Sequence, residues 1–212
     1  MRSGRRLPRR LVQLYLGLVL YGASMALLVR SGLGVMPWDV LHQGLARQIG
    51  WSMGAVTIAV GALVLLAWIP LRERPGLGTV SNVLVIGLVL DAVLAVLEAP
   101  SSLAARIAFA VAGVVLNAVA TAAYVGVQLG PGPRDGLMTG LVRRTGRSVR
   151  LVRTSIEVAV VATGWLLGGT LGVATVVYAL AIGPLVQVLL PPLTVSPAAR
   201  PTPPAGGPAP RG

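Results

Sequence analysis

The chain has 212 residues, of which 55% are hydrophobic and 11% charged, and its formal net charge is +12. Soluble domains usually carry about a quarter charged residues, so this composition excludes an ordinary water-soluble monomer and predicts a membrane protein. Because the chain contains no cysteine, it also excludes a disulfide framework and a thiolate metal site.

The chain starts with a basic segment, residues 1–10, which we expect to lie in the cytoplasm. The apolar run that follows, residues 11–29, is long enough to cross a bilayer. It ends before Arg30 and has no A-x-A cleavage site near its end, so we interpret it as a retained first helix and not as a signal peptide.

A short helix is predicted next, over residues 37–49. Gly34 would end the preceding helix, Pro37 suits a first turn, and Asp39 would lie beside the free backbone N–H groups of that turn. At 1.5 Å per residue such a helix is about 18 Å long, too short to span a membrane. Ser52 is placed to cap the next helix.

Two interpretations of this short helix remain open. It can lie flat at the membrane surface with Asp39 as a simple cap, a setting that suits Trp38 and His42. Alternatively, it can be re-entrant and bring its first turn near the middle of the bilayer. In the first case His42 is interfacial, whereas in the second it is a candidate proton relay.

Further apolar runs predict five more spanning helices. They cover residues 53–71, 77–97, 107–127, 151–169 and 171–190. A second short helix is expected after the fourth span, where Pro133 and Asp135 repeat the Pro-x-Asp pattern. The last residues, 195–212, are rich in Pro, Ala and Gly and are predicted to be a disordered tail.

The chain aligns with itself without gaps when it is shifted by 96 residues. The shift superposes Pro37 and Asp39 on Pro133 and Asp135, and more than a quarter of the aligned positions are identical. Each repeat, residues 11–100 and residues 107–194, holds three spans. Because three is an odd number, the second repeat must be inverted in the membrane relative to the first. The predicted fold is therefore an all-α bundle of six transmembrane helices in two inverted three-helix repeats.

The positions of the 18 basic residues, all arginine, agree with this topology. With a cytoplasmic N-terminus and six spans, 15 of them fall on the cytoplasmic side and only Arg30, Arg47 and Arg106 fall outside. The basicity is therefore interpreted as a topology signal and not as a nucleic-acid-binding surface. Both termini are expected in the cytoplasm.

Ionisable groups within predicted spans are candidates for a substrate or ion pathway. Asp91 lies in the third span without a basic neighbour one turn away, and it is either a coupling carboxylate or a hydrogen-bonded structural group. Glu157 follows Arg153 by four residues, so it is either an i,i+4 ion pair or part of a site. Pro37, Asp39, Pro133 and Asp135 complete the candidate set.

Neutral groups such as Asn117 and Tyr178 are expected to form hydrogen bonds between helices.

The paired motifs "GLGVMPWDVLHQGL" and "LGPGPRDGLMTGL" resemble those of the YczE-like family of bacterial integral membrane proteins, which is related to the YitT group. The resemblance covers residues 10 to 190 and rests on the repeated Pro-x-Asp-x-Leu-x-x-Gly-Leu. It implies a multi-span protein of the bacterial inner membrane and supplies no substrate.

No motif for an enzyme, a nucleotide-binding loop or a metal site occurs in a suitable setting, so we expect no catalytic activity, no cofactor and no metal.

The leading hypothesis is a small-molecule transporter or permease with Asp39 and Asp135 near its pathway. One alternative is a non-transporting regulator that binds a partner protein through Arg143, Arg144 and Arg147. Another is the substrate-binding subunit of a multi-component importer. The expected partners are the lipid bilayer and an unknown substrate, with a homo-oligomer or a partner protein also possible.

Overall fold

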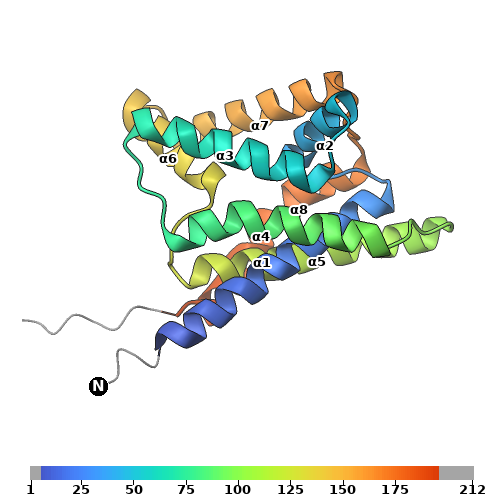
Figure 1. Cartoon of the computed structure of the whole chain (residues 1–212), viewed down its shortest axis with the longest axis horizontal. Helices are drawn as coiled ribbons and strands as arrows, with labels where there is room; N and C mark the ends of the chain where they lie inside the picture. The colour runs from blue at the N-terminus through green and yellow to red at the C-terminus, as the bar shows by residue number, and fades with distance from the viewer. Residues whose placement is uncertain (1–5, 196–212) are drawn as a thin grey trace, which may run out of the picture.

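A computed structural model describes residues 6–195, and these residues form eight α-helices joined by short connections (Figure 1). The helices are α1 (Arg6–Ser31), α2 (Pro37–Ile49), α3 (Met53–Leu71), α4 (Leu77–Val96), α5 (Leu103–Gly126), α6 (Pro133–Thr145), α7 (Val149–Leu166) and α8 (Val173–Leu193). The predicted all-α class is confirmed. Residues 1–5 of the basic N-terminal segment and residues 196–212 of the predicted disordered tail lie outside the described part of the chain, whereas Val195, the first residue of that tail, is buried and its N–H donates to Gly126 O.

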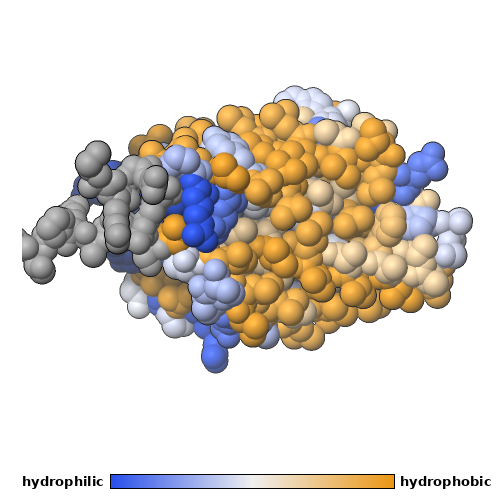
Figure 2. All heavy atoms as spheres, turned by 90° about the horizontal axis from the view of Figure 1, so that it is seen from below, coloured by the Kyte–Doolittle hydropathy of each residue, from blue (hydrophilic) through white to orange (hydrophobic). Residues whose placement is uncertain are grey.

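Five helices, α1, α3, α4, α5 and α8, are long and apolar enough to cross a membrane. They leave large aliphatic side chains exposed, among them Leu88, Leu180 and Val188. On the face shown in Figure 2, apolar residues cover the middle of the molecule and hydrophilic residues gather toward its two ends. A surface of this kind is stable against lipid. The chain is therefore a polytopic helical membrane protein.

The sixth predicted span, residues 151–169, is less apolar than the other five. The corresponding helix α7 has 18 residues, and three of them, Arg150, Arg153 and Glu157, are charged. It ends at Leu166 because Gly168 takes a positive φ of 95°. Composition and length alone therefore support five spans.

Other helix bounds agree closely with the sequence predictions. The short helix α2 and the helix α3 have the predicted ends. The first helix begins at Arg6 and not at residue 11, since its basic first turns pack on the chain after α5. There Arg10 donates to the carbonyl oxygens of Val127 and Gln128.

The helices α1–α4 and α5–α8 correspond in order, length and capping. Both α2 and α6 have 13 residues, begin with proline and end at a glycine in the left-handed region, Gly50 with φ 73° and Gly146 with φ 66°. The next helix in each half is capped by the predicted serine: Ser52 Oγ accepts from the N–H of Ala55, and Ser148 Oγ accepts from the N–H of Leu151.

Two equivalent backbone hydrogen bonds join the halves. The N–H of Ala174 at the start of α8 donates to Leu33 O at 3.0 Å, and the N–H of Gly78 at the start of α4 donates to Leu129 O at 2.8 Å. Gly34, with φ 127°, lies in the loop after α1 and not at its end, which corrects its predicted role. A Cβ on Gly34 would lie 2.7 Å from Thr175 Oγ1. The close approach and the positive φ both require glycine there.

The short helices pack against helices of the opposite half: α2 lies along α7, and α6 lies along α3. Glycine allows these contacts, since a Cβ on Gly164 of α7 would lie 2.3 Å from the backbone nitrogen of Leu41 in α2. Figure 1 shows α2 and α6 at opposite ends of the molecule.

This packing leads to a first prediction. We expect Gly164→Ala to lower the free energy of unfolding by about 1–3 kcal/mol, because the added methyl group overlaps backbone atoms of α2. Gly183→Ala in α8 is the matched control, since no atom lies within 4 Å of a Cβ there. Thermal unfolding of the two purified variants in detergent measures the difference. Equal melting temperatures would contradict the close contact between α2 and α7.

Candidate functional site

A cavity of about 500 Å³ lies at the centre of the molecule, between the two halves. All eight helices contribute to its wall. Its polar and aromatic lining residues are Tyr21, Trp38, His42, Thr57, Asn82, Thr121, Tyr124, Arg134, Asp135, Arg153, Glu157, Tyr178 and Gln187. A cavity of this size holds a small organic molecule.

The first turns of α2 and α6 meet at this cavity. Arg134 in the first turn of α6 lies with its Nη2 3.8 Å from Asp39 Oδ1 in the first turn of α2, and its guanidinium stacks over the Trp38 ring at 4.8 Å. The last turns of the two short helices contact different parts of the protein. Arg47 at the end of α2 donates to Gly168 O after α7, whereas Arg143 at the end of α6 donates to Leu71 O at the end of α3. The two short helices therefore point their N-terminal ends toward each other.

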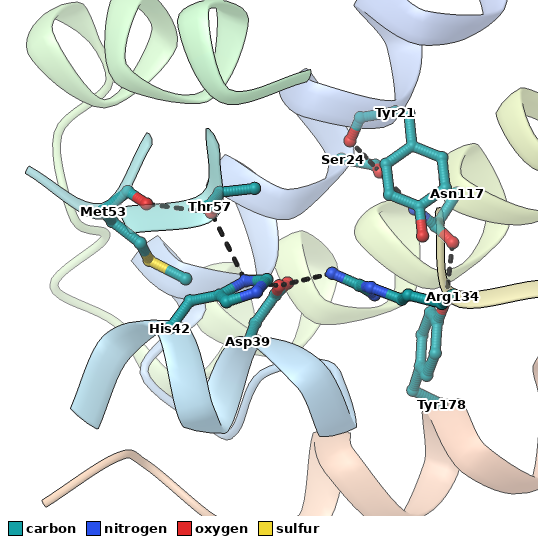
Figure 3. A network of polar contacts seen from close by, with 9 residues as sticks. All are labelled: Tyr21, Ser24, Asp39, His42, Met53, Thr57, Asn117, Arg134 and Tyr178. Carbon is teal, nitrogen blue, oxygen red and sulfur yellow. Dashed lines mark hydrogen bonds and ion pairs between the residues drawn. The ribbon is translucent and has the colours of Figure 1, made fainter. Parts of the chain in front are cut away.

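A buried polar cluster forms around Asp39 (Figure 3). His42 Nδ1 lies 3.0 Å from Asp39 Oδ1 and 3.3 Å from Thr57 Oγ1, and the Thr57 hydroxyl donates to Met53 O. His42 is only 1% exposed. The expectation that it is interfacial is therefore wrong, because its ring packs inward against α3. Burial lowers the pKa of His42 below its usual value, although the hydrogen bond to Asp39 opposes this shift.

The carboxylate of Asp39 is buried and incompletely paired. Its Oδ1 accepts from His42, whereas its Oδ2 has no hydrogen-bond partner among the described residues. The side chain makes no hydrogen bond to the free N–H groups of its helix, so it is not a simple cap. A buried carboxylate oxygen without a partner is costly unless a proton, an ion or water reaches it.

The equivalent residue Asp135 projects into the cavity and is exposed there. Its Oδ2 accepts a long hydrogen bond of 3.4 Å from the hydroxyl of Tyr124. Although its side chain is open to the cavity, the protein that encloses it raises the pKa of Asp135 above its usual value, while the nearby charges of Arg134 and Arg153 oppose the shift. The two aspartates of the repeated motif thus reach the same central region in different environments.

The two motif prolines, Pro37 and Pro133, also line the cavity, each as the first residue of its short helix. The carbonyl of Pro133 accepts a hydrogen bond of 3.0 Å from the indole nitrogen of Trp68, a fully buried residue of α3. The prolines therefore fix where each short helix begins, beside the cavity.

The remaining two candidates lie in different places. Glu157 lines the cavity and forms the expected i,i+4 ion pair with Arg153, at 3.0 Å. Asp91 lies outside the cavity lining and binds the start of α3, where it accepts from Ser52 Oγ at 2.5 Å and from the N–H of Gly54 at 2.7 Å. The structure therefore groups Asp39, Asp135 and Glu157, together with the prolines, and leaves Asp91 apart.

A second buried network crosses the bundle and reaches the cavity at Tyr178 (Figure 3). The Tyr178 hydroxyl donates to Asn117 Oδ1 at 2.7 Å, and Asn117 Nδ2 donates to Ser24 Oγ at 2.9 Å. These bonds join α8, α5 and α1, so the prediction that Asn117 and Tyr178 link helices is confirmed.

Sequence reasoning missed the central position of Arg134 and the partnership of His42 with Thr57. Both Arg134 and His42 lie within five residues of a motif proline, which is the signal that could have marked them. Two of the arginines assigned to a partner-binding face are exposed but make contacts within this chain. Arg143 pairs with Glu73 at 2.9 Å, and Arg144 donates to Pro70 O.

Within residues 6–195, no group of three His, Asp or Glu side chains is arranged to hold a metal ion.

Comparisons with known proteins find a matching family and several relatives of this chain. A family described as "Family of unknown function (DUF6198)" matches residues 8–191. An uncharacterized protein of Haemophilus influenzae is 42% identical over 84% of this chain and 81% of its own length. The uncharacterized membrane protein YczE of Bacillus subtilis is 31% identical over 84% of this chain and 83% of its own. No solved structure matches the chain significantly.

Proposed function

The chain belongs to the family of unknown function DUF6198, and from the cavity between its two halves we propose that it is a small-molecule transporter or permease. It has six spans, α1, α3, α4, α5, α7 and α8, in two inverted repeats, with α2 and α6 as re-entrant half-helices. It resides in the bacterial inner membrane with both termini in the cytoplasm.

Support for α7 as the sixth span comes from its counterpart α3. The two helices start three residues after the equivalent glycines that end the short helices, Gly50 and Gly146, and each packs on the short helix of the other half. The charged residues Arg150, Arg153 and Glu157 lie in the first half of α7. Of these, Glu157 and Arg153 line the water-accessible cavity, where charge is tolerated inside a membrane protein.

Support for the orientation comes from the arginines. The end of α6 and the start of α7 carry Arg143, Arg144, Arg147 and Arg150, and in Figure 1 they lie at the same end of the molecule as the first turns of α1. The last residues of α8 are at the same end, because Gln13 of α1 donates to Leu193 O. A concentration of arginine at one end is typical of the cytoplasmic side.

The observation that carries the proposal is an asymmetry between the halves. α3 packs along α4, where Gly54 contacts Gly87 and Asp91 holds the start of α3. The equivalent helices α7 and α8 make few contacts with each other. Gly183, the counterpart of Gly87, faces open space and lines the cavity.

We infer that the cavity is closed between α3 and α4 and open between α7 and α8. Arg153, one turn into α7, and Gln187, near the end of α8, both line it. Two equivalent helix pairs of which one is closed and the other open form the arrangement that alternating access requires. Transport then exchanges the open and closed states between the two pairs.

A cysteine introduced at Gly183 tests this arrangement, and the natural chain contributes no background thiol. We expect Gly183→Cys to react with a membrane-impermeant maleimide added from the side of the N-terminus, because its Cβ enters the cavity. Leu180→Cys, one turn earlier on the same helix and 73% exposed on its outer surface, is the control. It should remain unlabelled because it faces lipid. Labelling of both variants, or of neither, would refute a water-filled pathway between α7 and α8.

A further inference from the structure

Asp135 differs from the other carboxylates of the central region because no cation is paired with it. Glu157 pairs with Arg153 and Asp39 with Arg134, whereas no arginine or histidine nitrogen of the described residues lies within 4.0 Å of Asp135. Its hydrogen bond comes from the Tyr124 hydroxyl. Three carboxylates and two arginines meet in this region, so one negative charge is left over after the two ion pairs, although the charges of Arg134 and Arg153 also act on Asp135 from a greater distance.

Aromatic rings line the cavity that this charge faces. Tyr124 and Tyr21 are in edge-to-face contact with their centroids 6.1 Å apart, and Tyr178 lines the same cavity from α8. The faces of such rings attract cations. Trp38 demonstrates the preference within this cavity, since its ring already carries the guanidinium of Arg134.

Resting on the proposed function, we propose that the cavity binds a small organic ammonium ion between the Asp135 carboxylate and the tyrosine rings, and that a proton replaces this ion on the same carboxylate. The ammonium ion pairs with the carboxylate that has no close cationic partner, while its alkyl groups lie against the rings. An anion would instead meet the carboxylate of Asp135, while Arg134 and Arg153 are already paired with Asp39 and Glu157. The cavity volume of about 500 Å³ admits an ion of the size of choline.

Proton competition follows from the surroundings of Asp135. The titratable and charged groups that face this region are Tyr21 on α1, Asp39 and His42 on α2, Tyr124 on α5, Arg134 on α6, Arg153 and Glu157 on α7, and Tyr178 on α8. Because burial raises the pKa of Asp135, its carboxylate takes up a proton at a higher pH than an ordinary aspartate. Affinity for the ammonium ion should therefore be full at alkaline pH and fall as the pH drops through this raised pKa.

Calorimetric titration of the full-length protein in lipid nanodiscs tests the proposal. The probes are choline chloride, propylammonium chloride, sodium acetate and glucose, each at pH 8 and at pH 5. We expect saturable binding of an ammonium probe at pH 8, a clear loss of affinity at pH 5, and no binding of acetate or glucose. Asp135→Asn should lower the affinity by roughly tenfold or more.

The matched control is Glu98→Gln, which removes a carboxylate from the exposed loop after α4 and should leave binding unchanged. If Asp135→Asn fails to fold, the pH dependence of the natural protein still decides the matter. Preferential binding of acetate, binding that is equal at both pH values, or no binding of either ammonium probe would overturn the inference. The thiol labelling at Gly183 uses no ligand, so its result separates a failure of the substrate class from a failure of the transport proposal.

Discussion

A disulfide is expected to form readily between Ser52→Cys and Asp91→Cys, and at least about ten times more slowly between Ser148→Cys and Gln187→Cys. In the first pair, Ser52 Oγ and Asp91 Oδ2 are 2.5 Å apart. The second pair occupies the equivalent positions of the other half, where α7 and α8 make few contacts and Gln187 faces the cavity. Close approach of the two Cβ atoms is a geometric requirement for a disulfide.

The rates of both disulfides can be followed by gel mobility after mild oxidation in membranes. The two pairs are matched in residue position, helix order and number of thiols, so they differ only in the state of the helix pair. If the protein alternates as proposed, the slower disulfide still forms to completion, since each molecule visits the state in which α7 and α8 close. Equal rates would contradict the asymmetry, and a Ser148–Gln187 pair that never reacts would contradict the alternation.

The second large effect is expected at the contact between the short helices. Arg134→Gln leaves the buried Asp39 without its cationic neighbour, and we expect the free energy of unfolding to fall by about 3 kcal/mol, at the low end for breaking a buried ion pair because Arg134 is partly exposed. Removing both charges in Asp39→Asn with Arg134→Gln should recover most of this loss.

Thermal unfolding of the natural protein, the two single variants and the double variant measures the coupling energy between the residues. A strong coupling indicates that the first turns of α2 and α6 contact each other in the membrane. Strictly additive losses would show that Arg134 and Asp39 act independently, and would remove the ion pair from the account of the site.

Much of the secondary structure could be predicted because its signals are local. Pro37 and Gly50 mark the start and the end of α2, and Ser52 caps α3, as helix-end chemistry predicts. The same signals recur at Pro133, Gly146 and Ser148, which is why α6 could be expected. Hydropathy located the five apolar helices, but it is a weak guide to α7, where charged residues line a cavity.

The arrangement of the site could be predicted only in part, since its partners are distant in the sequence. The motif places Asp39 in the first turn of a helix but does not reveal that Arg134, on the other short helix, lies 3.8 Å away. Histidine is a residue type that suits a membrane interface, and only the packing of α2 against α3 shows that the ring of His42 is buried beside Thr57. Asp91 had no visible partner because Ser52 and Gly54, which hold it, are on another helix.

The inverted arrangement of the two halves is the claim on which the transport proposal depends most directly. Ile49 and Thr145 occupy equivalent exposed positions at the ends of α2 and α6. Ile49→Cys and Thr145→Cys can be labelled in intact cells and in inverted vesicles with an impermeant thiol reagent. The account predicts labelling of Ile49→Cys from outside the cell and of Thr145→Cys from the cytoplasmic side. Labelling of both positions from the same side would contradict it.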